Sequence, residues 1–284
     1  MLKIAIPIDN DFTRKSVEIL RKSGVDFLKS ANEFGVFCSQ EFPAQIRIME
    51  FEQIISAVES GAQDIGIIGE HHFINTVSDV CCVHTFSSYK TNFSLFVSNT
   101  LKYRGLESMT GRKIATPFPN LVNLFFKKQN IRTNVFQYQK HLGLAIELGM
   151  ADGICVLFDE RLRNFYNQLC EVEVIMQSSP IIIKNKKLIA TKQVIFDELI
   201  DRIKSVQNAD GKKMVYVTVP LEKKDSVLQV LESYKYKMFE MAIDHGNLFV
   251  FNTVADEKHL WDLQMHLKLL GAVSIYVLPI EKII

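Results

Sequence analysis

The chain has 284 residues, 48% of them hydrophobic, which is enough to bury a core in two or three domains of ~100 residues each. Its 33 lysine and arginine residues nearly balance 32 aspartate and glutamate residues, so the formal net charge is +1. Nucleic-acid surfaces and polybasic membrane anchors need a local excess of positive charge, and the sequence contains no long block of like charge. We therefore expect neither nucleic-acid binding nor membrane attachment.

The start of the chain and its cysteines indicate where the protein works. Residues 1–8 read as a folded strand, whereas a secretory signal needs a longer apolar stretch and a small-residue cleavage site. The longest apolar runs are too short to cross a bilayer. The five cysteines form no CxxC pair and each neighbours an apolar residue, which is typical of buried thiols in a reducing compartment. The sequence predicts a cytoplasmic protein.

Short β-branched runs alternate with helical segments through the first 208 residues, a pattern that is typical of an α/β fold. The predicted strands are 2–8, 45–49, 64–68, 80–86, 93–98, 113–116, 134–138, 153–158, 172–176 and 181–184. The predicted helices are 13–22, 51–60, 121–128, 141–150, 160–168 and 193–207. We interpret residues 1–90 plus 176–208 as lobe I and residues 91–175 as lobe II. Ligands are then expected at the carboxyl ends of the strands, in a crevice between the lobes.

A polar segment at residues 208–211 is the clearest boundary in the chain, and residues 212–284 beyond it predict a compact βαββαβ unit. Its predicted strands are 214–219, 238–243, 248–254 and 274–280, and its predicted helices are 223–233 and 256–270. This order of elements is the ferredoxin-like arrangement. Such units often serve as small-molecule regulatory domains, although the fold alone does not establish that role.

Six segments, in order along the chain, resemble segments of long-form ATP phosphoribosyltransferases. They are residues 61–70, 113–119, 149–154 and 171–175, the pair Leu260-Trp261, and residues 271–282. Each segment is weak alone, but together they follow the family order at nearly the family spacing. The resemblance implies a two-lobed catalytic region like that of periplasmic binding proteins, followed by a C-terminal ferredoxin-like (ACT-like) regulatory domain.

The resemblance also implies a reaction and its partners. Family members join ATP and phosphoribosyl pyrophosphate at adenine N1 and release pyrophosphate, which opens histidine biosynthesis. They need Mg²⁺, and histidine bound to the C-terminal domain inhibits the long form. We therefore expect a nucleotide or phosphosugar as ligand if binding is retained. The resemblance also leads us to expect a homo-oligomer (dimer or hexamer) or an assembly with an active relative.

The loop that should hold the 5′-phosphate is rewritten. Family members place a Ser-Thr-Gly-x-Thr-Leu type loop at a helix N-terminus, where backbone N–H groups and the helix dipole favour an anion. The aligned residues here are Asp159, Glu160, Arg161, Leu162, Arg163 and Asn164. A carboxylate ~4 Å from a phosphate dianion repels it by ~1 to 4 kcal/mol per charge. Two interpretations stay open: Arg161 and Arg163 bind the phosphate instead, or Asp159 simply caps a helix.

Polar groups are lost at other points of the same expected site. Val156 stands where the family has an acidic residue suited to ribose hydroxyls, and Gly143 stands where it has a glutamate. Asp9 lies in a turn that is basic in the family, and Glu50 replaces an arginine. Strands and apolar helix faces survive while polar ligands are lost, so we expect no intact catalytic residue, weak or absent catalysis, and a doubtful need for Mg²⁺.

Five residues remain candidates for the substrate crevice: Gly66, Gly69, Glu70, Thr116 and Asp152. Glu70 and Thr116 lie at predicted strand ends that face this crevice. The two glycines would permit close approach of a ligand, or would serve only packing and turns. The pair His71-His72 is not expected to bind a metal, because adjacent residues on a helix point in different directions.

The C-terminal unit carries one more substitution. Lys237 and Met238 align with the Pro-Thr pair near which family members hold histidine. The loss of the hydroxyl acceptor and the added cation disfavour a ligand that carries its own ammonium group, so we expect no histidine binding.

Two functions remain open from the sequence. One is a binding or regulatory paralogue that assembles with an active relative or senses another small molecule. The other is an active ATP phosphoribosyltransferase that uses non-standard substrate contacts. A stand-alone solute-binding protein would share the two-lobed architecture, but the missing export signal weakens that reading.

Overall fold

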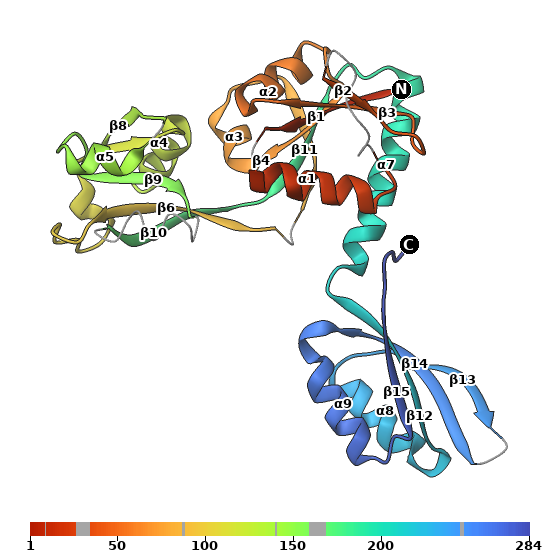
Figure 1. The fold of residues 1–284 in the computed structure, drawn as a ribbon. Helices are drawn as coiled ribbons and strands as arrows, with labels where there is room; N and C mark the ends of the chain where they lie inside the picture. Colours follow the sequence, from red (N-terminus) through yellow and green to blue (C-terminus); the bar gives the residue numbers. More distant parts are fainter. Residues whose placement is uncertain (9, 27–34, 87–88, 140, 159–168, 245–246) are drawn as a thin grey trace. The chain divides into compact units, whose positions relative to one another are not determined.

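The computed structural model describes residues 1–8, 10–26, 35–86, 89–139, 141–158, 169–244 and 247–284 (Figure 1). These residues form two compact units, Met1–Ile200 and Asp201–Ile284. The division falls within one long helix, α7 (Ala190–Ala209). Both units combine helices with sheets, so the predicted α/β class is confirmed.

A six-stranded sheet with the order β2-β3-β1-β4-β11-β5 forms part of the first unit. Its strands are β1 (Leu2–Pro7), β2 (Val36–Cys38), β3 (Ala44–Met49), β4 (Ile65–Gly69), β5 (Val80–Thr85) and β11 (Pro180–Asn185). Strand β1 pairs in parallel with β3 and β4, so the carboxyl ends of these three strands lie at one edge of the sheet. Strand β2 pairs antiparallel with β3, and β11 pairs antiparallel with β4 and β5.

Helices cover this sheet because the central strands are apolar on both faces. Strand β4 is buried along its whole length, as expected of a strand covered on both sides. Helix α2 (Phe51–Glu59) buries Ile54 and Val58 in a cluster with Ile183 of β11. Helix α1 (Asn10–Lys22) precedes β2, and the short helix α3 (Glu70–Asn75) begins directly where β4 ends.

The second sheet of this unit has five strands in the order β10-β6-β9-β7-β8. Its elements are β6 (Thr91–Ser98), the 3₁₀ helix η1 (Leu106–Met109), β7 (Lys113–Thr116), α4 (Pro119–Lys128), β8 (Asn134–Gln137), α5 (Leu142–Glu147), β9 (Gly153–Leu157) and β10 (Leu169–Ser178). Strand β7 pairs in parallel with β8 and β9, so their carboxyl ends also share one edge. Phe93, Ile114 and Phe126 belong to its main core cluster.

The chain crosses between these two sheets at short connections. Figure 1 shows β6 beside β10, and β10 leads into β11, which starts only two residues after β10 ends. The predicted lobe boundary near residue 90 lies between β5 and β6. The predicted boundary near residue 176 lies within β10.

The second unit is a four-stranded antiparallel sheet with two helices, in the order β13-β14-β12-β15. Its elements are β12 (Lys212–Pro220), η2 (Leu221–Lys223), α8 (Lys224–Ser233), β13 (Phe239–Asp244), β14 (Leu248–Asp256), η3 (Glu257–His259), α9 (Leu260–Leu269) and β15 (Ser274–Pro279). Buried and partly exposed residues alternate along β12 and β14, which is typical of a sheet with one covered face. Val217 and Phe251 pack with Leu231 of α8 and Leu263 of α9 on that face. The order of elements is ferredoxin-like, as predicted.

The structure departs from the predicted elements at a few places. Strand β2 and helix α3 were not predicted, because both are too short to show a period. The predicted helix 256–270 starts later, as β14 continues to Asp256 and η3 precedes α9. The predicted helix 160–168 lies outside the described residues, as does part of the predicted turn at 244–247. In the described chain, no helix combines the length and apolar character that crossing a membrane requires.

Candidate functional site

The carboxyl ends of the parallel strands are the first place to look for a ligand site in sheets of this kind. In the six-stranded sheet, Ile8, Glu50 and Glu70 follow directly after β1, β3 and β4. The backbone N–H of Ile8 donates to Met49 O at 2.8 Å, which continues the strand pairing to this edge. In the five-stranded sheet, Phe118 lies between β7 and α4 at the corresponding edge.

The N-terminus of α4 is already capped by the protein. The first N–H groups of a helix have no partner within the helix and can hold an anion. Here Asn75 Oδ1 accepts hydrogen bonds from Asn120 N at 3.0 Å and from Leu121 N at 3.3 Å. The backbone oxygen of Asn75 also accepts from Asn120 Nδ2 at 2.8 Å. Two N–H groups that could face a phosphate therefore bind a side chain at the end of α3.

His71 of α3 is buried at this edge, with a relative exposure of 2%. Its Nδ1 lies 2.7 Å from Ser178 Oγ, and its backbone N–H donates to the same oxygen at 3.3 Å. Burial lowers the pKa of His71 well below its ordinary value, and the nearby His72 adds to this shift. The ring is therefore uncharged at neutral pH.

Five rings pack together around His71, and we refer to them as the aromatic cluster: Phe51, His71, His72, Phe93 and Phe118. His72 stacks on Phe51 with centroids 4.2 Å apart, and both histidines meet Phe118 edge-on at 4.8 Å. The His71 and His72 rings lie 4.5 Å apart, so the expectation that they point in different directions is wrong. The cluster joins α2 and α3 to β6 and the residue before α4.

Gly66 and Gly69 are closely surrounded by the protein itself. A Cβ atom at Gly66 would lie 2.5 Å from Ile54 Cγ2 of α2. A Cβ atom at Gly69 would lie 2.2 Å from His71 Cε1. Packing against α2 and against the aromatic cluster therefore accounts for both glycines.

Two further candidates have their polar groups committed elsewhere. Thr116 is fully buried, and its hydroxyl donates to Cys155 O at 2.8 Å and accepts from Phe118 N at 3.1 Å. Asp152 precedes β9, so it lies at the amino edge of the sheet and away from the carboxyl edge where it was expected. There its Oδ1 pairs with Arg112 Nη1 at 2.9 Å and its Oδ2 accepts from Lys113 N at 2.9 Å.

Among the candidate crevice residues, Glu70 has a partly exposed side chain and lies at the carboxyl edge of the six-stranded sheet. Its backbone N–H donates to Ser179 O at 2.9 Å, which fixes the start of α3 next to the end of β10. Of the five candidates, the structure brings Glu70 and Gly69 together at this edge.

The structure describes three positions of the first unit where this chain departs from the family pattern, namely Glu50, Gly143 and Val156. Glu50 is exposed and precedes α2 without a side-chain cap, and Gly143 is the second residue of α5. Val156 lies on β9 and packs against an apolar cluster that includes Phe96 and Leu142. Asp9 and the loop positions Asp159, Glu160, Arg161, Leu162 and Arg163 lie outside the described residues.

The effector positions lie in the second unit, just before β13. Lys237 is exposed, and its backbone oxygen accepts a hydrogen bond from Thr253 Oγ1 at 2.8 Å. Met238 packs against the core cluster of this unit. Whether histidine binds there stays a prediction.

The described residues contain no group of three or more His, Cys, Asp or Glu side chains that could hold a metal ion. Magnesium is usually bound by one or two carboxylates together with substrate phosphates. The described residues thus do not fit an ion held by the protein alone. The need for Mg²⁺ stays a prediction.

Comparison with known proteins gives these features a context. The family model described as "HisG: ATP phosphoribosyltransferase" matches residues 51–205. The ATP phosphoribosyltransferase of Bacteroides fragilis is 31% identical over 284 residues, covering 100% of both chains. That of Bacteroides thetaiotaomicron is 30% identical with the same coverage. This chain belongs to the ATP phosphoribosyltransferase family.

The fold of this ATP phosphoribosyltransferase family member agrees with a solved structure. The ATP phosphoribosyl transferase (HisG:HisZ) complex from Thermotoga maritima matches with a TM-score of 0.58 at 17% identity. The match covers 72% of this chain and 96% of that chain. The expectation of a two-lobed α/β fold is thereby confirmed.

Asn75 was not predicted as a site residue, and His71 was considered only as a metal ligand. Their partners, Asn120 and Ser178, are 45 and 107 positions away in the chain. No local pattern in a six-residue helix points to such distant partners. Because α3 was not predicted, nothing in the sequence indicated that Asn75 caps a helix.

Proposed function

We propose that this family member performs little or no phosphoribosyl transfer and acts as a binding or regulatory paralogue. The observation that carries the proposal is Val156, which packs in an apolar cluster on β9 where the family has an acidic residue. An aliphatic side chain cannot accept hydrogen bonds from ribose hydroxyls. A hydrogen bond to a charged group contributes about 1.5 to 3 kcal/mol, so its loss alone would weaken substrate binding strongly.

Other described residues support the same conclusion. Gly143 supplies no carboxylate at the start of α5, and exposed Glu50 replaces a cation with an anion beside α2. The Thr116 hydroxyl and the N-terminus of α4 are engaged within the protein. Polar groups at the expected site are thus missing, reversed in charge or already paired.

An assembly with another chain is part of the proposal. The Thermotoga maritima relative is described as a HisG:HisZ complex. In the second unit, the face of the sheet away from α8 and α9 exposes Met241 (55%) and Tyr276 (63%), beside Leu278. Exposed apolar patches often mark interfaces. They support a homo-oligomer (dimer or hexamer) or an assembly with an active family member, in which this ACT-like unit makes the contact.

A cytoplasmic location belongs to the same proposal. All five cysteines are free in the structure, but the expectation of buried thiols is wrong for Cys38, Cys82 and Cys170, which are exposed. Exposed free thiols persist in a reducing compartment.

Pyrophosphate release from ATP and phosphoribosyl pyrophosphate tests the proposal. The purified chain should release it far more slowly than the usual turnover of ~1 to 10³ per second. An active family member, assayed alone and with this chain added, provides the control and reveals any regulatory effect. Turnover in the usual range by this chain alone would refute the proposal.

The alternative is an active ATP phosphoribosyltransferase with non-standard contacts. The match to curated enzymes over the full length of both chains supports it. In that case Arg161 and Arg163 replace the small loop residues as phosphate ligands. The double variant Arg161→Gln/Arg163→Gln would then abolish turnover, whereas under our proposal it removes no activity.

A further inference from the structure

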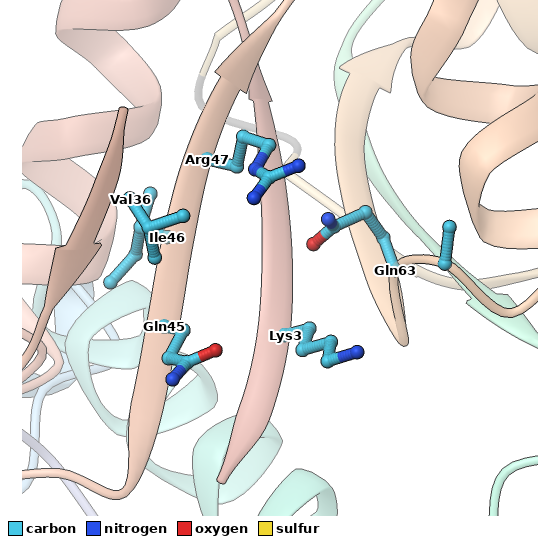
Figure 2. Close-up of a pocket in the computed structure, with 7 residues that line it drawn as sticks. Lys3, Val36, Gln45, Ile46, Arg47 and Gln63 are labelled. Carbon is cyan, nitrogen blue, oxygen red and sulfur yellow. The ribbon is translucent and has the colours of Figure 1, made fainter. Parts of the chain in front are cut away.

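A small polar pocket lies at the amino ends of β1 and β3, at the edge of the six-stranded sheet opposite the candidate site. Four of the side chains that line it are polar: Lys3, Gln45, Arg47 and Gln63 (Figure 2). Its volume is about 120 Å³. Liquid water occupies ~30 Å³ per molecule, so the pocket has room for an ion of a few heavy atoms.

The strand register brings three of these side chains to one face of the sheet. Lys3 of β1 lies directly beside Gln45 of β3 in the parallel pairing. Gln45 and Arg47 are two residues apart on β3, and side chains two apart on a strand point to the same face. Lys3, Gln45 and Arg47 therefore face the same space.

Gln63 completes the pocket from the segment between α2 and β4. Its backbone N–H donates to Ala57 O at 2.9 Å, and the next residue, Asp64, donates its N–H to Lys3 O at 2.9 Å. Asp64 Oδ2 accepts the Lys3 N–H in return at 2.8 Å. These bonds fix Gln63 beside the start of β1, and Figure 2 shows its amide pointing toward Arg47.

Three polar side chains of this pocket, those of Lys3, Arg47 and Gln63, have no partner among the described residues, whereas Gln45 Nε2 donates to Met1 Sδ at 3.8 Å. Gln63 is only 6% exposed, yet its side-chain amide makes no hydrogen bond with described residues. Within the same part of the chain, Lys3 Nζ and the Arg47 guanidinium have no carboxylate partner. The nearby Asp64 carboxylate is instead paired with Lys192 Nζ at 2.7 Å. The Gln63 amide is not one of the fully buried side-chain groups without a partner, so it is open to the pocket, where water or a bound ion can pair with it.

We propose that this pocket binds a small oxyanion, namely phosphate or the phosphoryl group of a small metabolite. Arginine presents a planar fork of donors that matches phosphate oxygens, lysine adds a second cation, and the Gln63 amide adds N–H donors. The site lies at the edge of the sheet opposite Glu50 and Glu70, so it is separate from the expected substrate site. The inference does not depend on whether the protein catalyses phosphoribosyl transfer.

The side-chain amide signals of Gln63 in ¹⁵N-labelled full-length protein report this site directly. The Arg161→Gln/Arg163→Gln protein serves as the background, so that binding at the other predicted phosphate loop does not contribute. Inorganic phosphate, added at constant ionic strength, should shift the Gln63 signals until the site is saturated. The signals that disappear in the Gln63→Leu variant are those of Gln63. Ribose 5-phosphate in a second titration tells whether a phosphoryl group on a larger molecule also fits, and acetate in a third tests a planar anion.

Matched variants decide the outcome. Arg47→Gln should weaken phosphate binding about ten-fold or more, because a charge-assisted hydrogen bond is lost. Lys128→Gln, which removes an exposed cation of α4, should leave the affinity unchanged. Since Arg47 is exposed, its variant is expected to fold even if a change at buried Gln63 does not. Unshifted Gln63 signals, or equal affinities for the wild-type and Arg47→Gln proteins, would overturn the proposal.

Discussion

Asn75 Oδ1 accepts a hydrogen bond from Asn120 N at 3.0 Å, so a residue at the end of α3 caps α4. The two helices follow the carboxyl ends of β4 and β7, which belong to different sheets of the first unit. One side chain thus both ties these segments together and occupies N–H groups where an anion could bind. The contribution of this cap to the free energy of unfolding can be measured.

Replacing Asn75 with alanine removes the acceptor for the Asn120 and Leu121 N–H groups. Loss of a helix cap usually costs about 1 kcal/mol of stability, within ~0.5 to 2 kcal/mol. We expect the free energy of unfolding to fall by that amount, measured by urea unfolding followed by circular dichroism. Asn75→Asp keeps an acceptor oxygen and serves as the control with nearly wild-type stability. An alanine variant as stable as the aspartate variant would show that the cap does not stabilise the fold.

The sequence predicted the elements with a clear period better than the contacts between them. A continuous apolar run predicts strand β4, and alternation with helical spacing predicts the C-terminal βαββαβ unit. Short elements such as β2 and α3 carry too few residues to show a period. Their existence depends on pairing with β3 and on packing against Phe118, which no local pattern encodes.

The candidate site shows the same division. Strand ends could be located from the sequence, and Glu70 and Gly69 do lie at one. The hydrogen-bond partners of a side chain could not be predicted from the sequence, because they depend on tertiary contacts. Asp152 fits a strand-end motif, yet it lies at the amino end of β9 and pairs with Arg112, 40 positions earlier in the chain. A polar residue near a strand can lie at the amino edge or at the carboxyl edge of the sheet, and only the fold decides which.

Gly66 offers a test of close packing between β4 and α2. An added Cβ atom would lie 2.5 Å from Ile54 Cγ2, so Gly66→Ala should destabilise the protein by about 1 to 3 kcal/mol. Ile54→Ala removes that methyl group and is the matched background. The Gly66→Ala change should cost less there, and a double-mutant cycle of urea unfolding measures the coupling. If Gly66→Ala lowers the free energy of unfolding equally in both backgrounds, then contact with Ile54 is not what restricts this position.

The C-terminal unit should not bind histidine. Lys237 is exposed and brings a cation to the position of the family's proline, and Met238, at the position of the threonine, is engaged in the core cluster. Isothermal titration calorimetry should show no binding in the micromolar range, whereas an active long-form relative serves as the positive control. The double change Lys237→Pro/Met238→Thr is expected to increase affinity. Micromolar affinity in the unaltered chain would contradict the prediction.

His71 should make the stability of the protein depend on pH. Burial, with a further contribution from His72, lowers the pKa of His71 well below its ordinary value. In the unfolded chain the ring takes up a proton near pH ~6.5, whereas in the folded protein it stays neutral. The unfolded state therefore binds more protons below that pH, and the free energy of unfolding must fall as the pH is lowered. The contribution of His71 is fully present above the unfolded pKa and is lost as the pH falls toward the folded pKa.

Urea unfolding of the wild type and of His71→Gln between about pH 7.5 and about pH 5.5 isolates this effect from other titrating groups. The wild type should lose up to about 1.4 kcal/mol per pH unit more than the variant over the acidic part of that range. Ser178→Ala tests whether the contact between Ser178 Oγ and Nδ1 contributes to the lowered pKa beside burial. It removes the hydroxyl that lies 2.7 Å from Nδ1 while the ring stays buried among Phe93 and Phe118. If burial is the main cause, Ser178→Ala keeps the wild-type slope. If Ser178→Ala instead abolishes the slope, the hydrogen bond holds the ring neutral, and if wild type and His71→Gln share one slope, His71 takes up its proton in the folded protein.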